Sequence, residues 1–384
     1  AAEKSDEGLS IQVCVRIRPP PLDGLTDKYK PRTHFDGEIH RTDGSVAWKW
    51  SDKRIVYQDP LDKEYYYGHQ AQQYVFSNIF PMMTTTKEVF QQIGAPIVKR
   101  TFDGYNCCIF AYGQTNSGKT FTISGTPDSP GIISLAVQNF FEHISGLTDR
   151  RSLLRVAFLE IYNEQLKDLL CNKAKLLTIK EDPDRGCPVV ANLTERVVSS
   201  LEEVIAYAAE GEKRRVFGCN NVHEHASRSH TVFQLIFESR ALTEAEIRVS
   251  TLNIVDLAGS ELAFTHLEPG TPTLEGYIGP GENKTREREG ANIRKSLLAL
   301  SRVVEALATR PGDHIPYRDS KLTRILQSAL GGNSSTAMIA TVNPWMSGVD
   351  DRQTNATLRF AVTAQKVDNH PRRVNLISAD QALL

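Results

Sequence analysis

Long hydrophobic stretches are missing from this 384-residue chain, because no apolar run approaches the ~20 residues that a helix needs to cross a bilayer. Closely spaced cysteine pairs are missing too. None of the six cysteines forms a C-x-x-C pair, and Cys14, Cys107 and Cys108 lie in segments typical of strands. These absences argue against a membrane-spanning segment and a cysteine zinc site. They favour buried thiols in a reducing intracellular compartment.

An excess of either charge is also missing. Lysine and arginine number 45 and aspartate and glutamate 46, which gives a net charge of −1. This balance excludes a generally basic nucleic-acid-binding protein, although it is compatible with a local basic face. We therefore expect no nucleic-acid partner and no membrane contact by this segment.

The chain does contain a phosphate-binding loop. The apolar run from Cys107 to Ala111 predicts a buried strand, and it leads into GQTNSGKT, a G-x-x-x-x-G-K-T pattern. The glycines let backbone N–H groups form an anion nest, the lysine places a positive charge on the outer phosphates, and the threonine hydroxyl can ligate Mg²⁺. The expected nucleotide-binding residues are Gly113, Gln114, Thr115, Asn116, Ser117, Gly118, Lys119 and Thr120.

Two further segments could detect a γ-phosphate. DLAGSE, from Asp256 to Glu261, follows an apolar strand, so that the aspartate can hold the Mg²⁺ shell and the Gly259 N–H can approach the phosphate. Upstream, residues 226–230 (ASRSH) place hydroxyls and one arginine directly before another strand. Taken alone, the first pattern is also compatible with a turn after a strand, and the second with a polar surface loop.

The distribution of apolar residues predicts an α/β fold. It predicts strands at 231–238 and 249–256, and helices at 292–309 and 319–330. Residues 22–75 read as a surface lobe of short strands and loops. Strands that alternate with helices predict one central sheet covered on both faces.

In combination, these motifs resemble the kinesin motor domain. RIRP at 16–19 is similar to the family's adenine-contacting R-x-R-P, GQTNSGKT to its phosphate loop, and SRSH at 227–230 to the end of its switch I. DLAGSE is its switch II, and YRDSKLTR at 317–324 matches a signature at the microtubule face. The resemblance implies the kinesin motor fold, a phosphate-loop NTPase with a central mixed, mostly parallel eight-stranded sheet and helices on both faces.

The resemblance also implies a Mg²⁺-dependent, microtubule-stimulated ATPase that binds ATP and ADP. The adenine would lie beside Arg16, Arg18, Pro19 and Phe121. The metal would be held by Thr120, Ser227 and, through water, Asp256. Catalysis would rest on Ser227, Arg228, Gly259 and Glu261, with a salt bridge between Arg228 and Glu261 that closes on ATP binding. Microtubules would contact Arg294, Lys295, Arg318, Lys321 and Arg324.

Three features depart from the family pattern. His223 replaces the leading asparagine of switch I, and Ala226 replaces its first serine. Residues 262–291 are longer than the usual loop after switch II and carry several prolines and glutamates. We expect an active, slow ATPase, and the alternative is a kinesin-fold microtubule anchor with little or no turnover. His223 could help to bind phosphate or simply be solvated, and the long loop is either a disordered insertion or an altered microtubule contact.

The resemblance divides the chain into three parts. Residues 1–365 correspond to the motor domain, 366–376 to the neck linker, in which Asn375 matches a latching asparagine, and 377–384 to the truncated start of a neck coiled coil. This order implies movement toward microtubule plus ends and a homodimer formed by a coiled coil beyond residue 384. Segments such as LLRVAFLEIYNE and DQALL resemble the kinesin-7 class. We expect the protein on cytoplasmic microtubules, with the spindle or the kinetochore as candidate locations.

Overall fold

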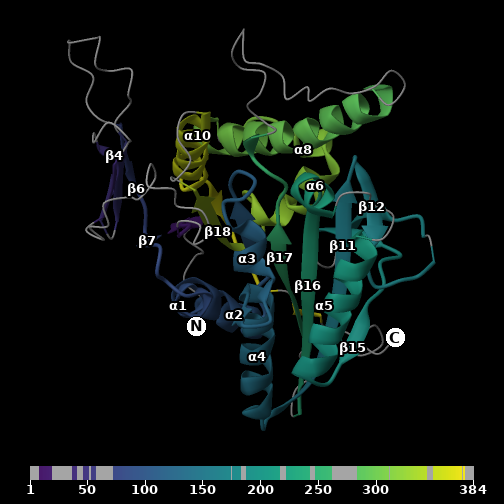
Figure 1. Cartoon of the computed structure of the whole chain (residues 1–384). Helices are drawn as coiled ribbons and strands as arrows, with labels where there is room; N and C mark the ends of the chain where they lie inside the picture. The colour runs from purple at the N-terminus through teal and green to yellow at the C-terminus, as the bar shows by residue number, and fades with distance from the viewer. Residues whose placement is uncertain are drawn as a thin grey trace.

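A ten-stranded sheet forms the centre of the computed structural model (Figure 1). The structure describes residues 8–19, 37–40, 46–51, 53–57, 72–173, 175–182, 187–216, 222–242, 247–261, 283–310, 312–343, 349–373 and 375–376. The strand order is β12-β11-β16-β17-β8-β18-β2-β7, with β15 beside β11 and β20 beside β17. These strands are β2 (Gln12–Ile17), β7 (Asn78–Phe80), β8 (Cys107–Tyr112), β11 (Arg150–Tyr162), β12 (Gln165–Asp168), β15 (Arg196–Val198), β16 (His230–Ala241), β17 (Ile247–Asp256), β18 (Ser335–Val342) and β20 (Asn375–Leu376).

The sheet is mixed and its main path has eight strands, as the family resemblance implies. The four pairs β17–β8, β8–β18, β18–β2 and β2–β7 are parallel. The three pairs β12–β11, β11–β16 and β16–β17 are antiparallel, and so are the contacts of β15 and β20. The description "mostly parallel" therefore fits one half of the sheet, because β16 and β17 follow one another in the chain and pair as neighbours, which gives antiparallel strands.

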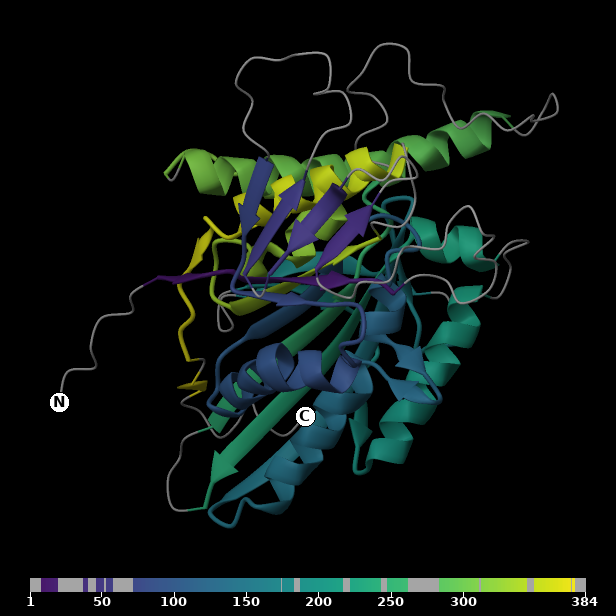
Figure 2. The ribbon, with the colours of Figure 1, turned by 60° about the vertical axis from the view of Figure 1, so that its left-hand side comes forward.

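Helices cover both faces of the sheet (Figure 2). Alternate residues of β8 face opposite layers: Cys108 and Phe110 join the core with three helices, whereas Cys107, Ile109 and Ala111 join the core with the others. The first layer contains α8 (Asn283–Thr309), α9 (Lys321–Ile325) and α10 (Val349–Ala364). The second contains α1 (Thr86–Val89), η3 (Phe90–Gly94), α2 (Ala95–Phe102), α3 (Lys119–Ile123), α4 (Ile132–Ser145) and α5 (Leu201–Val216). No helix in the described ranges is long and apolar enough to cross a membrane.

Two helices differ from the sequence prediction. The helix expected at 292–309 begins earlier, at Asn283, because the polar residues before 292 continue it without any apolar signal. The helix expected at 319–330 is broken into η4 (Tyr317–Asp319), α9 and η5 (Gln327–Ala329). Ser320 causes the first break: its backbone is extended, and its hydroxyl caps α9 by accepting the Thr323 N–H at 3.1 Å.

The predicted surface lobe contains a small antiparallel sheet at the edge of the molecule. Its order is β3-β4-β5-β6, and its strands are β3 (Glu38–His40), β4 (Val46–Trp50), β5 (Arg54–Tyr57) and β6 (Gln72–Val75). Trp48, Ile55 and Tyr74 are buried, and the Tyr74 hydroxyl donates to the Asn355 side chain of α10. The prediction of short strands is confirmed for the described part of residues 22–75.

The segment after α10 runs back along the core. β19 (Asp368–Asn369) pairs with β1 (Leu9–Ser10) near the start of the chain, and β20 pairs with β17. Asn369 is fully buried, and its amide donates to the Ala329 and Ser334 carbonyls at 3.0 and 2.9 Å. Its Oδ1 accepts the Gly331 N–H at 2.7 Å. Asn369 therefore fixes the start of the segment, whereas the side chain of Asn375 and residues 377–384 lie outside the described residues.

Candidate functional site

The sheet brings the three predicted phosphate-sensing segments to one edge. β8 and β17 are parallel, with Asp256 opposite Ala111, so both strands end there. β16 runs in the opposite direction, with Thr231 opposite Asp256, so it begins at the same edge. The phosphate loop, switch II and the end of switch I therefore meet, although up to about 150 residues separate them in the chain.

The phosphate loop has the expected strand–loop–helix form between β8 and α3. Gly113 has φ +156°, and a Cβ atom on it would lie 2.1 Å from the Thr341 carbonyl oxygen. Gly118 has φ +102°, which also favours glycine. The Ser117 and Thr341 hydroxyls lie 2.7 Å apart, so the loop is fixed to β18.

Lys119 is buried beneath this loop. Its Nζ donates to the Gly113 and Gln114 carbonyl oxygens at 2.9 and 2.8 Å. Burial lowers the pKa of the Lys119 amine, while the carboxylates of Asp256 and Glu261 act in the opposite direction. The amine is thus held at the loop by two neutral carbonyl acceptors, and phosphate oxygens would be stronger acceptors.

Thr120 and Asp256 offer a fitting place for Mg²⁺. The Thr120 hydroxyl donates to Asp256 Oδ2 at 2.6 Å, and the buried Oδ1 has no hydrogen-bond partner among the described residues. An unpaired carboxylate oxygen beside a hydroxyl suits a hard cation that prefers oxygen ligands. In the part of the chain that the structure describes, no group of three or more His, Cys, Asp or Glu side chains could hold a metal. Mg²⁺ at this site would therefore also need water or phosphate oxygens.

The two switches are hydrogen-bonded to each other and to the phosphate loop. The Gly259 N–H, which the sequence assigns to the γ-phosphate, donates to the Ser227 carbonyl at 2.9 Å. The Ser260 N–H donates to the Gly113 carbonyl at 3.0 Å. The Glu261 carboxylate accepts the Thr115 N–H at 2.8 Å and also the Thr115 hydroxyl. Glu261 therefore lies against the phosphate loop in this structure.

Switch I rests on a buried ion pair that the sequence analysis missed. Arg215 of α5 and Glu160 of β11 are 2% and 1% exposed, and their side chains approach to 3.6 Å. Arg215 also donates to the Ala226 carbonyl and the Ser229 hydroxyl, both at 3.0 Å. The available signal was a glutamate inside the apolar strand LLRVAFLEIY, because a charge that is buried in a strand needs a partner.

This arrangement bears on the two substituted positions of switch I, both of which lie in α6 (Val222–Arg228). Ala226 is held through its backbone carbonyl, so this contact does not need the hydroxyl that the family pattern has there. The side chain of His223 lies outside the described residues.

His230 connects switch I, switch II and α8. Its Nδ1 accepts the Ala258 N–H at 3.0 Å, which places the proton of the neutral ring on Nε2. Nε2 lies 2.9 Å from the Ser296 hydroxyl of α8 and can donate to it. Burial, with smaller effects from Arg215 and Lys119, lowers the pKa of His230 to about 3. The ring is therefore neutral at physiological pH.

The state of His230 predicts a loss of stability in mild acid. Its pKa is lower in the folded than in the unfolded chain, so below about pH 6.5 the unfolded state binds the additional proton. The full unfolding free energy is therefore present above the unfolded pKa of His230, and it decreases as the pH drops from there toward 3. Between pH 7.5 and 5.5 we expect His230 alone to remove about 1.4 kcal/mol of unfolding free energy. Urea unfolding at the two pH values measures this change, and His230→Gln should lose that part of it.

The predicted adenine residues lie beside the phosphate loop. Arg16 is buried, its Nη1 donates to Thr122 Oγ1 at 2.9 Å, and its guanidinium lies 5.3 Å from the centre of the Phe121 ring. Burial lowers the pKa of Arg16 to about 10. Arg18 donates to the Asn116 carbonyl oxygen, and Pro19 is exposed. Phe121 is 42% exposed, so part of its ring is accessible.

The comparison with known families agrees with this site. Residues 43–367 match the kinesin motor domain. The chain belongs to the kinesin motor domain family. Members of this family are microtubule-stimulated ATPases. The family resemblance and the α/β fold predicted from the sequence are thereby confirmed.

Kinesin relatives match nearly the whole chain. Centromere-associated protein E of Homo sapiens is 40% identical over 99% of this chain, and kinesin-like protein KIN-7N of Arabidopsis thaliana is 39% identical over 97%. These matches confirm the likeness to the kinesin-7 class. The chain spans 13% of the human protein and 41% of the plant protein.

Two solved kinesin structures have the same fold. A fast kinesin superposes with a TM-score of 0.77 and 29% identity, over 97% of this chain and 96% of that one. A KIF14 dimer, solved with AMP-PNP in complex with a microtubule, gives a TM-score of 0.75 and 31% identity, over 97% and 98%.

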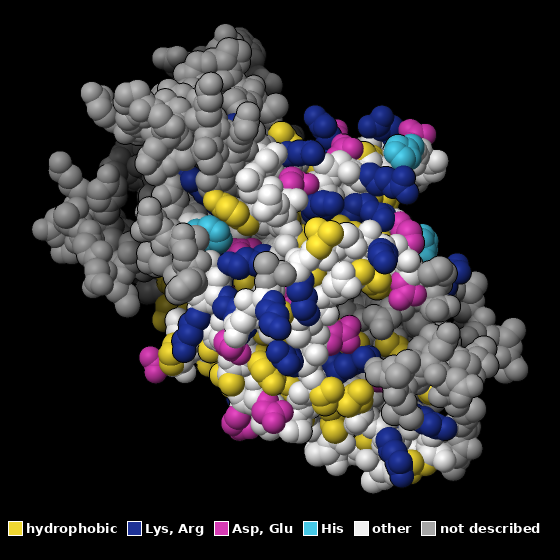
Figure 3. Space-filling view, turned by 90° about the vertical axis from the view of Figure 1, so that its right-hand side faces the viewer, with side chains coloured by type: hydrophobic (Ala, Val, Ile, Leu, Met, Phe, Trp, Pro, Cys, Tyr) yellow, Lys and Arg dark blue, Asp and Glu magenta, His cyan; other side chains and the backbone are white. Residues whose placement is uncertain are grey.

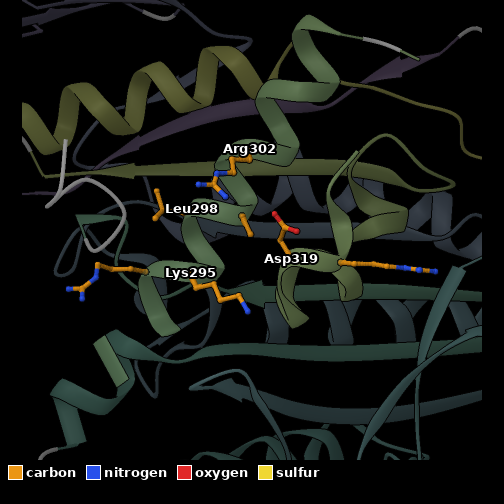
Figure 4. A pocket seen from close by; sticks show the side chains of 7 residues that line it. Lys295, Leu298, Arg302 and Asp319 are labelled. Atoms are coloured by element: carbon orange, nitrogen blue, oxygen red, sulfur yellow. The ribbon is translucent and has the colours of Figure 1, made fainter. Parts of the chain in front are cut away.

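This kinesin motor domain has a basic hollow between α8 and η4 (Figure 4). The hollow has a volume of ≈ 610 Å³ and contains three of the five cations predicted to contact microtubules, with Asp319 extending into it. Arg302, which the sequence analysis did not select, is a fourth cation. The lining residues are Arg294, Lys295, Leu298, Ala299, Arg302, Arg318 and Asp319.

The other two predicted cations lie on α9, outside this hollow. Lys321 is exposed, whereas Arg324 is 15% exposed and forms an ion pair with Glu181. The structure thus groups the predicted cations around α8, η4 and α9, but it does not leave them equally accessible.

The side of the molecule that carries β11, β12 and α5 shows Lys and Arg side chains with Asp and Glu side chains between them (Figure 3).

Proposed function

We propose that this chain hydrolyses Mg²⁺–ATP and couples hydrolysis to movement along microtubules toward their plus ends. The observation that carries the proposal is the meeting of Lys119, Thr120, Asp256, Gly259 and Glu261 at one edge of the sheet. Membership of the kinesin motor domain family supports the ATPase activity.

The phosphates of ATP would offer new hydrogen-bond acceptors to donors that are hydrogen-bonded to protein carbonyls in this structure. Lys119 would exchange its two carbonyl acceptors for phosphate oxygens, and the Gly259 N–H would turn from the Ser227 carbonyl toward the γ-phosphate. Thr120, Ser227 and, through water, Asp256 would hold Mg²⁺, which neutralises charge on the phosphates. These residues would bind and orient the nucleotide with little covalent chemistry.

Hydrolysis requires Glu261 to move. Its carboxylate, now on Thr115, would pair with Arg228 and orient a water molecule. That water would attack the γ-phosphorus as the bond to the ADP oxygen breaks, and phosphate and ADP would leave. Loss of the γ-phosphate contacts would then let both switches relax.

The segment at 366–376 supports a role as a neck linker. Val367 is buried, β19 pairs with β1, and β20 pairs with β17, so the segment lies along the core over much of its length. A segment held by a few short strand pairs can detach and return at modest cost. We propose that its docking follows the nucleotide state and directs movement toward the plus end.

The microtubule is the partner that the basic hollow favours. A surface with four cations and one carboxylate suits an acidic filament, and binding through it should weaken as salt screens the charges. The KIF14 structure is itself a microtubule complex. We propose that the chain works on the microtubule cytoskeleton as a homodimer, and the name of the human relative suggests the centromere as a location.

The direct test is steady-state phosphate release with and without microtubules at low salt. We expect a slow basal rate and strong stimulation by microtubules. Nucleotide-dependent microtubule binding without turnover would favour the anchor. Turnover without microtubule binding would indicate a phosphate-loop NTPase that does not act on microtubules.

A further inference from the structure

Two carboxylates hold the two ends of α9, one of the helices at the proposed microtubule face. Neither belongs to α8, η4 or α9. Glu164 lies in the turn between β11 and β12, and Glu181 lies on β13 (Thr178–Asp182), which pairs with β14 (Cys187–Ala191) as a hairpin. The proposed filament-binding cations are therefore supported by acidic side chains from a different part of the fold.

Glu164 holds the first turn of α9. Asn163 and Glu164 have φ values of +52° and +58°, and they connect β11 to β12 as a two-residue turn. Glu164 Oε2 accepts the Lys321 N–H at 3.0 Å, and Asn163 Oδ1 accepts from the Asn292 amide of α8 at 2.6 Å. Through these two bonds, one turn contacts both helices of the proposed microtubule face.

Glu181 holds the other end of α9 and does so through charge. Its Oε1 lies 2.6 Å from Arg324 Nη2, and Arg324 Nη1 donates to Gln327 at 2.5 Å. Arg324 is 15% exposed, whereas Glu181 is 56% exposed. Packing thus holds Arg324 in place, whereas Glu181 can move into water at low cost, because ion pairs with an exposed member contribute little stability.

We propose that Glu181 competes with the microtubule for Arg324: it occupies the arginine in the free motor domain, and acidic groups of the filament replace it on binding. This inference rests on the proposed microtubule partner. It follows that Glu181 lowers microtubule affinity and that Arg324, despite its place in the basic signature, contributes less than the cations of the hollow.

Glu181→Gln tests the competition. Glutamine can still accept a hydrogen bond from Arg324 but no longer neutralises it, so we expect microtubule affinity to rise about 2–5-fold at low salt, with the gain lost at high salt. Cosedimentation with microtubules at several salt concentrations measures this change. Glu142→Gln is the matched control, because Glu142 is exposed on α4 in the other helix layer and its replacement alters the net charge equally.

Arg324→Gln separates competition from simple repulsion between Glu181 and the filament. If Glu181 acts through Arg324, adding Glu181→Gln to Arg324→Gln should leave the affinity unchanged. An equal gain in both backgrounds would overturn the proposal, and so would a Glu181→Gln protein that binds no more tightly than Glu142→Gln.

Hydrogen exchange without microtubules keeps this inference distinct from the proposed function. Exchange across residues 317–330 should increase slightly in Arg324→Gln relative to Glu142→Gln, because the ion pair, although weak, joins α9 to β13. Unchanged exchange would show that the pair does not hold the helix. Absence of wild-type microtubule binding with any nucleotide would overturn the proposed function and the competition together, while the exchange result would still decide whether the pair holds α9.

Discussion

Replacement of Glu261 by alanine should abolish microtubule-stimulated phosphate release while ATP still binds. Among the described residues, Glu261 hydrogen-bonds to the phosphate loop through Thr115, so its loss leaves the hydrogen bonds of Lys119 and Thr120 in place. In the proposed mechanism, catalysis requires the carboxylate to leave Thr115, pair with Arg228 and orient water. A group that acts mainly in the transition state lowers turnover more than binding, and we expect turnover to fall by at least about 100-fold.

Stopped-flow binding of a fluorescent ATP analogue and steady-state phosphate release measure the two effects separately. Glu142→Ala, the same change at an exposed position of α4, should leave both unchanged. Turnover within a few-fold of the wild type in Glu261→Ala would contradict the proposed role. A parallel loss of nucleotide affinity would instead indicate that Glu261 supports the shape of the loop through Thr115.

The nucleotide-site motifs could be predicted because their chemistry depends on local backbone geometry. A phosphate cradle needs Gly113 and Gly118 at fixed spacing before Lys119, and that spacing survives in the sequence. The sheet then determines the rest: once β8 and β17 are parallel neighbours, the loops that follow them must meet at one edge. The order of motifs was sufficient to expect this meeting, although not to place individual side chains.

Side-chain pairs between distant segments could not be predicted in the same way. Glu160 and Arg215 are 55 positions apart, and Glu181 and Arg324 are 143 apart. Their contacts depend on how α5 and β13 pack, which no local pattern reports. The break at Ser320 was missed for a related reason, because one hydroxyl cap restarts the helix there and apolar periodicity does not report such a cap. The pair of Glu181 and Arg324 involves a predicted site residue. The sequence predicts which cations contact the filament, but it does not reveal that Arg324 is paired with Glu181.

Replacement of Lys119 by methionine should remove nucleotide binding without unfolding the protein. Burial lowers the pKa of the Lys119 amine, because it disfavours the charged form. An apolar side chain of similar length has no such desolvation cost. The carbonyls of Gly113 and Gln114 lose a donor, which costs about 1–3 kcal/mol per unsatisfied group and offsets the gain. We therefore expect a small net change in unfolding free energy, together with a loss of at least about 100-fold in ATP affinity, because two charge-assisted bonds to phosphate contribute about 1.5–3 kcal/mol each.

Thermal unfolding with and without Mg²⁺–ADP measures both parts in one experiment. A ligand at 100 times its Kd stabilises a protein by about 2.7 kcal/mol, and at one Kd by only about 0.4 kcal/mol, so a 100-fold weaker variant should lose nearly all of the shift. Lys99→Met, on the exposed side of α2, should melt like the wild type with and without ligand. A Lys119→Met protein that still shows the full ADP-induced shift would contradict the assignment of this amine to the phosphates. One that is unfolded without ligand would show instead that its bonds to Gly113 and Gln114 hold the loop together.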